Sequence, residues 1–402
     1  MINVIRELEV VMISQYFAPT KVIFGQGAEN EVGTQLEAFG AKRVLLVYGG
    51  HSAEKSGLLG KVRGILNEHG IYFHELGGVK PNPRISLARE GVRIYGEDGL
   101  DFILAVGGGS VIDTAKAIGY GVFGDCDPWD FYCGKRVPSG SAPVGVILTM
   151  AAAGSEMSDS SVLTNEDGGL KRGCNSDYCR VKFALMNPEL TYTVPDYQTS
   201  CGTVDIIMHT LERYFHAGKG LDFTDDLSFA LIRSVMENGR ILHKNPEDYD
   251  ARANVMWASS LSHNGLMATG NPSKGDWACH QLEHELSGMF DIAHGAGLAI
   301  VFPAWASYVA STDYSRFAKL GKHVFGIECT DDKEAAEKTI EAFKAFFSSL
   351  GMPVSLAEIN ITLSEDELGE LLDKATFYGK RTLGNFRILQ REDMEAVYRR
   401  CK

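Results

Sequence analysis

The sequence lacks an excess of basic residues and a long charge-free apolar run. Its 402 residues hold 39 lysines and arginines against 52 aspartates and glutamates, which gives a net charge of −13. Proteins that bind nucleic acid or anionic lipid through phosphates carry the opposite sign. No stretch reaches the roughly 18 uncharged apolar residues of a membrane span. We therefore expect no nucleic-acid and no membrane partner, and a small molecule as substrate.

Paired cysteines and a secretory signal are missing as well. The eight cysteines are scattered and form no CxxC pair, which argues against a disulfide framework and against a cysteine zinc cluster. The first residues, MINVIRELEVVMISQYF, carry Arg6, Glu7 and Glu9 and do not resemble a signal peptide. We expect reduced thiols in a cytoplasmic protein.

The order of apolar patterns predicts two different halves. Short buried strands begin near Lys42, Ile71 and Phe102 and alternate with helical patterns, as in βαβ units with a parallel sheet. After about Pro195 long helical periodicities dominate, at 203–215, 229–243, 251–268 and 333–350. We predict an α/β domain with a parallel sheet over residues 1–195 and an all-α domain over residues 196–402.

Neither the GxGxxG fingerprint nor a P-loop is present, and two other glycine turns stand in their place. A buried strand turns into a helix at Gly107-Gly108-Gly109-Ser110, and Asp113 and Lys116 follow in a GGGSxxDxxK arrangement. Such a turn lets backbone N–H groups approach a phosphate, although three glycines alone can simply form a tight turn. A second turn, 48–52, ends an earlier strand. Both turns fall at the carboxyl edge of a parallel sheet, which suits a dinucleotide.

Histidines and one aspartate cluster in the second half. Asp205 and His209 are four residues apart on a predicted helix, His280 and His284 repeat that spacing, and His294 follows. Residues four apart project from one helix face and can chelate together. A nitrogen and oxygen donor set without thiolate fits Fe(II) or Zn(II). A single histidine is more often a hydrogen-bonded helix residue, so the prediction depends on the cluster.

One competing motif overlaps this cluster. Residues 280–284, HQLEH, match HxxEH, in which two histidines bind zinc and Glu283 acts as general base of a metallohydrolase. That alternative explains neither the glycine turns nor Asp205 with His209. We therefore prefer the nucleotide-dependent interpretation.

Taken together, these motifs resemble the iron-containing (group III) alcohol dehydrogenase family over nearly the whole chain. The segments PTKVIFGQGA from Pro19, YGGHSAEKSG from Tyr48, KPNP from Lys80 and YDARANVMWAS from Tyr249 are most similar to its branch of NADPH-dependent aldehyde reductases and butanol dehydrogenases. The resemblance implies a dehydroquinate synthase-like fold, with a dinucleotide-binding domain followed by a metal-binding helical domain.

The resemblance also implies roles for individual residues. A divalent metal is held by Asp205, His209, His280 and His294, and His284 is left as the catalytic proton relay. We expect Asp113 near the phosphate turn. The cofactor-binding residues are Gly49, Gly50, His51, Ser52, Asn82, Gly108, Gly109, Ser110, Asp113, Thr149, Ser158, Lys171 and Leu190.

Departures from the family pattern bear on the cofactor. Ala153 replaces a hydroxyl of the usual threonine-rich loop, which weakens one phosphate contact. Gly50 stands where NAD-preferring members tend to carry aspartate, so we expect NADP with NAD as a second possibility. Glu54 stands where related enzymes often have lysine, which works against this preference.

The implied reaction is hydride transfer between NAD(P)H and an aldehyde or primary alcohol, assisted by Fe(II) or Zn(II) as Lewis acid. A polyol dehydrogenase of the glycerol type on the same fold is an alternative chemistry, beside the HxxEH zinc hydrolase. A non-catalytic nucleotide-binding protein is a third. The family resemblance and the commonness of two-fold symmetry predict a homodimer.

Overall fold

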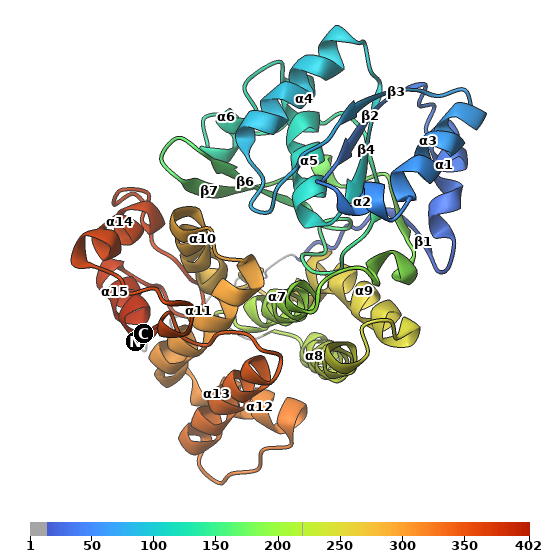
Figure 1. Ribbon diagram of the computed structural model, residues 1–402. Coiled ribbons are helices and arrows are strands. Elements are labelled where there is room, and N and C mark those ends of the chain that lie inside the picture. Colours follow the sequence, from blue (N-terminus) through green and yellow to red (C-terminus); the bar gives the residue numbers. More distant parts are fainter. Residues whose placement is uncertain (1–13, 219) are drawn as a thin grey trace, which may run out of the picture.

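A six-stranded parallel sheet forms the upper part of the computed structural model (Figure 1), which describes residues 14–218 and 220–402. The prediction about a signal peptide rests mainly on residues 1–13, which lie outside the described ranges. The strands follow the order β1 (Lys21–Phe24), β8 (Phe183–Met186), β5 (Val144–Leu148), β4 (Phe102–Gly107), β2 (Arg43–Tyr48) and β3 (Tyr72–Leu76). The sheet and the helical half confirm the predicted fold class.

Alternate side chains of the strands enter two separate cores. Leu45 and Val47 of β2 pack with helices on one face, and Val44 and Leu46 pack with helices on the other. Successive strand residues point to opposite faces, so near-continuous apolar strands require cover on both sides. The first face carries α4 (Ile85–Glu97), α5 (Gly109–Gly124) and α6 (Trp129–Tyr132), and the second carries α1 (Val32–Ala38) and α3 (Leu58–Glu68).

The register of the sheet aligns the ends of its central strands. Tyr48 lies opposite Val106, and Gly107 lies opposite Leu148. The turns after β2, β4 and β5 therefore leave the same edge of the sheet. The short helix α2 (Ser52–Lys55) begins at the first of these turns and α5 at the second. Both predicted glycine turns do share one edge.

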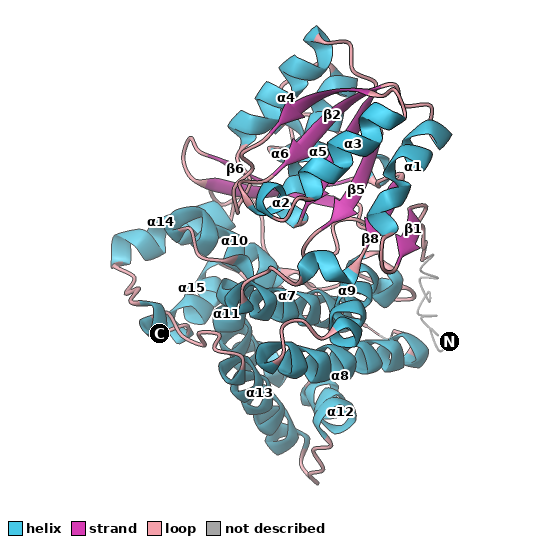
Figure 2. Ribbon diagram, turned by 45° about the vertical axis from the view of Figure 1, so that its right-hand side comes forward, coloured by secondary structure: helices cyan, strands magenta, loops and turns pink. Residues whose placement is uncertain are grey.

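A β-hairpin that the sequence did not reveal connects the two halves. Strands β6 (Ser160–Asn165) and β7 (Leu170–Asn175) pair antiparallel, apart from the main sheet. β6 packs on α5, and β7 contacts α10 (Ala278–Phe290) of the helical half. Figure 2 shows the hairpin beneath α4 and above α14 and α10. It brings residues of the first half to the helical half.

The helical half begins with α7 (Asp196–Tyr214), close to the predicted change at Pro195. It continues with α8 (Asp222–Lys244), α9 (Tyr249–His263), α10, α11 (His294–Val309), α12 (Tyr314–Phe325), α13 (Asp332–Ser349), α14 (Glu365–Ala375) and α15 (Arg391–Arg400). Short 3-10 turns lie at 28–31, 177–179, 188–191, 266–268, 310–312 and 357–359. The helix predicted over 251–268 ends early, because Gly265 adopts a φ of 99° and starts a separate turn.

One helix differs from the expectation that no stretch is apolar enough to span a membrane. Residues His294–Thr312 are long and apolar enough to cross a membrane by length and composition, and 78% of that window is buried inside the protein. Figure 1 shows α11 between α10, α7 and α15. Burial of an all-round apolar helix in a protein core explains the composition of this segment.

Candidate metal and nucleotide site

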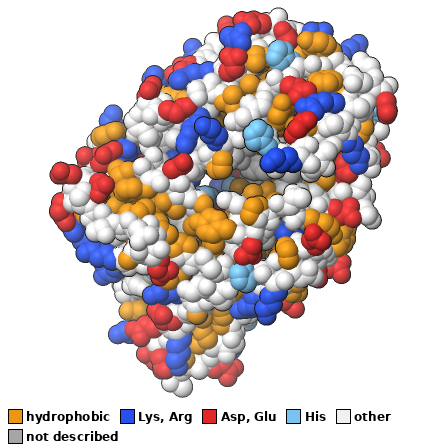
Figure 3. Space-filling view, in the orientation of Figure 1, with side chains coloured by type: hydrophobic (Ala, Val, Ile, Leu, Met, Phe, Trp, Pro, Cys, Tyr) orange, Lys and Arg blue, Asp and Glu red, His pale blue; other side chains and the backbone are white. Residues whose placement is uncertain are grey.

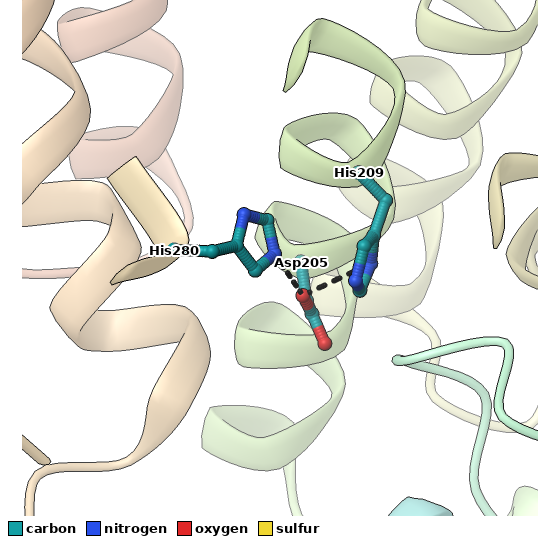
Figure 4. Close-up of side chains that lie close together, drawn as sticks. All are labelled: Asp205, His209 and His280. Atoms are coloured by element: carbon teal, nitrogen blue, oxygen red, sulfur yellow. Dashed lines mark ion pairs between the residues drawn. The ribbon is translucent and has the colours of Figure 1, made fainter. Parts of the chain in front are cut away.

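Side chains from three helices converge on one carboxylate oxygen. On α7, Asp205 Oδ1 lies 3.2 Å from His209 Nδ1. His280 of α10 brings Nε2 to 3.6 Å from the same oxygen, as Figure 4 shows. His294, the first residue of α11, places its Nε2 at 3.8 Å from it. The structure therefore brings together all the side chains that were predicted to ligate metal.

The donor atoms of this cluster lack hydrogen-bond partners. Among the described residues, Asp205 Oδ1, His209 Nδ1 and His280 Nε2 are buried and have no hydrogen-bond partner. An unsatisfied buried polar atom costs about 1–3 kcal/mol, so several at one point call for a ligand. Imidazole nitrogens with one carboxylate oxygen form a donor set for Fe(II) or Zn(II). The residues fit a divalent transition metal.

Two further carboxylates orient the histidine rings. Glu212 Oε1 accepts a hydrogen bond from His280 Nδ1 at 2.9 Å, and Glu283 Oε2 is hydrogen-bonded to His294 Nδ1. Both glutamates are fully buried. A donor bond from Nδ1 fixes the tautomer that leaves Nε2 free to ligate. Glu212 was not among the predicted site residues, and Glu283 was predicted only as the general base of the alternative hydrolase.

Lys171 and His284 lie beside this cluster. The Lys171 Nζ lies 3.5 Å from Glu283 Oε2 and 3.4 Å from His294 Nδ1. Burial by itself raises the pKa of Glu283, but His294 and Lys171 lower it to about 2. The ring centre of His284 is 5.5 Å from that of His294. Burial, reinforced by Lys171, holds the pKa of His284 well below its usual value, so this imidazole is neutral.

A cavity of about 960 Å³ connects the cluster with the sheet edge. Its walls include Asp205, His280 and His284 from the helical half, and Gly109 and Ser110 from the glycine turn. Figure 3 shows the surface hollowed between the sheet half and the helical half. A Cβ at Gly107 would lie 2.4 Å from Val111 Cγ2, so only glycine permits this turn. One cavity therefore contains both a glycine turn of the kind that binds phosphates and a cluster of side chains of the kind that binds a metal.

Comparison with known proteins agrees with this pairing. A sequence model described as "Iron-containing alcohol dehydrogenase" matches residues 19–188, and one described as "Fe-containing alcohol dehydrogenase family, C-terminal" matches residues 199–401. The chain belongs to the iron-containing alcohol dehydrogenase family. It is an oxidoreductase.

Relatives of this alcohol dehydrogenase are similar over nearly their whole length. NADH-dependent butanol dehydrogenase A of Clostridium acetobutylicum is 40% identical, over 96% of this chain and 98% of the relative. The NADPH-dependent aldehyde reductase YqhD of Escherichia coli is 35% identical, over 91% and 93% of the two chains. The crystal structure of NADH-dependent butanol dehydrogenase A from Thermotoga maritima superposes with a TM-score of 0.93 at 37% identity, over 97% and 98% of the chains.

These relationships favour the dehydrogenase over the HxxEH hydrolase, and the geometry agrees. Glu283, the proposed general base of the hydrolase, is fully buried. Its carboxylate already has hydrogen bonds to Ser287, His294 and Lys171. His280 joins Asp205 and His209, whereas His284 groups with Glu283 and His294. The two histidines of the motif thus belong to different groups.

The predicted cofactor residues of the alcohol dehydrogenase fall into two sets. Those that line the cavity are Asn82, Gly109, Ser110, Asp113, Ser158 and Lys171. Those outside its lining are Gly49, Gly50, His51, Ser52, Gly108, Thr149 and Leu190. Thr149 donates its N–H to Gly107 O at 3.1 Å and so belongs to the same edge. Leu190 packs against the sheet core. Cofactor contact remains a prediction for both sets.

A buried lysine fastens the loop beside the glycine turn. Lys116, from the GGGSxxDxxK motif, donates to Ser155 O at 2.7 Å, Ser158 O at 3.0 Å and Ser160 O at 2.8 Å. Asp113 accepts hydrogen bonds from Ser155 Oγ and Val162 N. The polar residues of the motif therefore hold a loop that lines the cavity.

Proposed function

We propose that this enzyme reduces short aldehydes to primary alcohols, and runs the reverse reaction, with a nicotinamide cofactor and a divalent metal held by Asp205, His209, His280 and His294. The convergence of these donors in one cavity with the glycine turn carries the proposal. The relatives' names, butanol dehydrogenase and aldehyde reductase, support the substrate class. A divalent iron or zinc ion would supply a Lewis acid for the carbonyl oxygen, and nicotinamide would supply hydride.

The protein's own residues orient the predicted metal ligands and transfer the proton that the reduction requires. Glu212 and Glu283 hold the ligand rings, and the loop fastened by Lys116 shapes the cavity wall. His284 lines the cavity and is neutral, so one ring nitrogen donates while the other accepts. Such a ring relays a proton from water towards the substrate oxygen without becoming a stable cation. Full turnover in a His284→Ala enzyme would remove this role.

For the cofactor we favour NADP(H), with NAD(H) as the alternative. A Cβ at Gly50 would meet no atom within 4 Å, which leaves room for a 2′-phosphate beside the turn. Glu54 is exposed nearby and pairs with Arg63 at 2.9 Å, which offsets part of its negative charge. One relative is named as NADH-dependent and another as NADPH-dependent. The ratio of the rates with NADPH and with NADH therefore decides which cofactor this enzyme prefers.

We also propose a cytoplasmic homodimer. All eight cysteines are free, which suits a reducing compartment. β1 is an edge strand of the sheet, and its Phe24 is exposed beside Trp257. Light scattering on the purified protein tests the dimer, because a monomer mass at micromolar concentration contradicts it.

The decisive experiment is oxidation of NADPH and NADH by butanal, with chelator-stripped protein and with protein reconstituted with Fe(II) or Zn(II). We expect turnover only after metal is restored. Equal rates in stripped and reconstituted protein would overturn the metal role. Nucleotide binding without turnover of any aldehyde would overturn the substrate class.

A further inference from the structure

Arg213 continues the ligand-bearing face of α7. Asp205, His209 and Arg213 are spaced by four residues, so they lie one above another on the helix. Arg213 is only 5% exposed, yet it contributes to the lining of the cavity. A cationic side chain thus lies one turn beyond a predicted metal ligand.

The guanidinium of Arg213 is incompletely satisfied. Its Nη1 donates to His209 O at 2.9 Å, and its Nε is buried without a partner. Within the described ranges, no acid lies within 4 Å of the guanidinium of Arg213 as an ion pair, and the charges of Asp159 and Glu212 act on it only from farther away. The guanidinium carbon lies 4.5 Å from the ring centre of Trp277, whose ring centre is 5.4 Å from that of His280. An unpaired buried arginine is costly unless a ligand compensates it.

Three other cations of the cavity wall are paired with acids. Lys171 pairs with Glu283, Arg172 with Glu285 at 2.6 Å, and Arg180 with Asp177 at 2.7 Å. Asp159 also lines the cavity, is two-fifths exposed and lies 3.8 Å from Arg180, and its negative charge also acts on Arg213. Arg381 also lines the cavity, and among the described residues no acid forms an ion pair with it; its Nε donates to Ala375 O at 2.8 Å and its guanidinium carbon lies 3.5 Å from the ring centre of Phe377.

A second cation lies beside Arg213. Lys274 lines the same cavity, is exposed, and its carbonyl accepts a hydrogen bond from Trp277 Nε1 at 3.1 Å. Trp277 therefore contacts the guanidinium of Arg213 and the backbone of Lys274. Two cationic side chains in the lining of one cavity match a planar anion, since arginine donates in a fork that fits a carboxylate.

We infer that Arg213, Trp277 and Lys274 form a subsite for an anionic group, so that the enzyme favours short aldehydes that carry a carboxylate at the end remote from the carbonyl. This inference rests on the proposed function. The carboxylate takes no part in bond changes: hydride passes from NAD(P)H to the carbonyl carbon, and a proton to its oxygen. One charge-assisted hydrogen bond to the substrate corresponds to an increase of about 10-fold to 100-fold in kcat/KM over a substrate that lacks the carboxylate.

The test compares 4-oxobutanoate with butanal and methyl 4-oxobutanoate on the metal-reconstituted wild-type enzyme. We expect kcat/KM to be at least about tenfold higher for the carboxylate, and this advantage to shrink as salt rises. Equal or lower kcat/KM for the carboxylate, while butanal is turned over, overturns the subsite. Absence of turnover with every aldehyde overturns the proposed function instead.

Variants locate the subsite. We expect Arg213→Gln to lower kcat/KM for 4-oxobutanoate about tenfold more than for butanal, and Arg213→Lys to retain part of the preference. Lys274→Gln, at an exposed position that folding tolerates, should reduce the preference by a smaller factor. Arg381→Gln is the matched control, because it removes another unpaired cation from the wall. If Arg381→Gln abolishes the preference and Arg213→Gln does not, or if Arg213→Gln lowers both substrates equally, the assignment is wrong.

Discussion

Glu212 Oε1 accepts two hydrogen bonds from His280, one from its backbone N–H and one from its ring Nδ1, each at 2.9 Å. The other oxygen of Glu212 accepts the N–H of Trp277 at 2.6 Å. One buried carboxylate on α7 thus satisfies the start of α10 and turns the ring of His280 towards Asp205. Helix packing and ligand orientation depend on the same side chain.

We predict that Glu212→Gln weakens metal binding by about tenfold to a hundredfold, which is the range for lost orienting groups. The neutral amide accepts more weakly from Nδ1 and can present its NH₂ group to that nitrogen, so Nε2 is no longer held as a ligand. Metal affinity is measured by competition with a chromophoric chelator. The control is Glu156→Gln, another buried acid, which bonds Ser260 and touches no predicted ligand. Wild-type affinity in Glu212→Gln would contradict the orienting role.

We expect bound metal to stabilise the folded protein, because the cluster without metal leaves three buried ligand atoms without hydrogen-bond partners. At a free metal concentration one hundred times Kd, the gain in free energy of unfolding is about 2.7 kcal/mol. We predict that Zn(II) or Fe(II) raises the Tm of chelator-stripped protein, and that Asp205→Asn abolishes most of this rise. Asp196→Asn is the control, since Asp196 is also on α7 and pairs with His243 at 3.0 Å, outside the cluster. Equal rises in both variants would show that metal binds elsewhere.

The clustering of the predicted metal ligands could be predicted in part, because residues at a fixed spacing on a helix share a face. Residues 205 and 209, four apart, necessarily share a face, and an apolar strand before three glycines necessarily ends at a sheet edge. That His294 joins them depends on the turn between α10 and α11, where Asp291 adopts a φ of 52°. The sequence placed His294 in the histidine cluster, but only the family resemblance selected it, and not His284, as a metal ligand.

Interactions across the chain could not be predicted in the same way. The β6–β7 hairpin consists of short, partly polar strands with no clear alternation, and it carries Lys171 to Glu283, 112 residues away. Arg213 gave no sequence signal, because an arginine in the last turn of a helix is ordinarily favourable there. Its missing acid partner is visible only in three dimensions.

The cofactor preference gives a charge-reversal prediction. Glu54 lies on α2, directly after the turn at Gly50, and its side chain is about half exposed. We predict that Glu54→Lys lowers KM for NADPH several-fold and changes KM for NADH little, because an added cation attracts only the extra phosphate. Glu68→Lys makes the same charge change at the far end of α3 and is the control. An equal change in the KM values for NADPH and NADH would show that Glu54 does not lie near the 2′-phosphate of bound NADPH.

Buried thiols give a prediction about alkaline stability. Burial raises the pKa of Cys401 to about 12, and likewise that of Cys174 and Cys201. In the unfolded chain these thiols ionise near pH 8.5. The folded state therefore binds more protons between about pH 9 and 12, so stability falls as pH rises through that window.

We predict that Cys401→Ala makes this fall shallower, by up to about 1.4 kcal/mol per pH unit. The free energy of unfolding is measured with urea at several pH values from 7 to 10.5. At pH 7 the variant loses some packing, so the comparison uses the slope and not the absolute value. Cys133→Ala is the matched control, because Cys133 is exposed and folding does not bury its sulfur. An unchanged slope in Cys401→Ala would mean that its thiol ionises equally in both states.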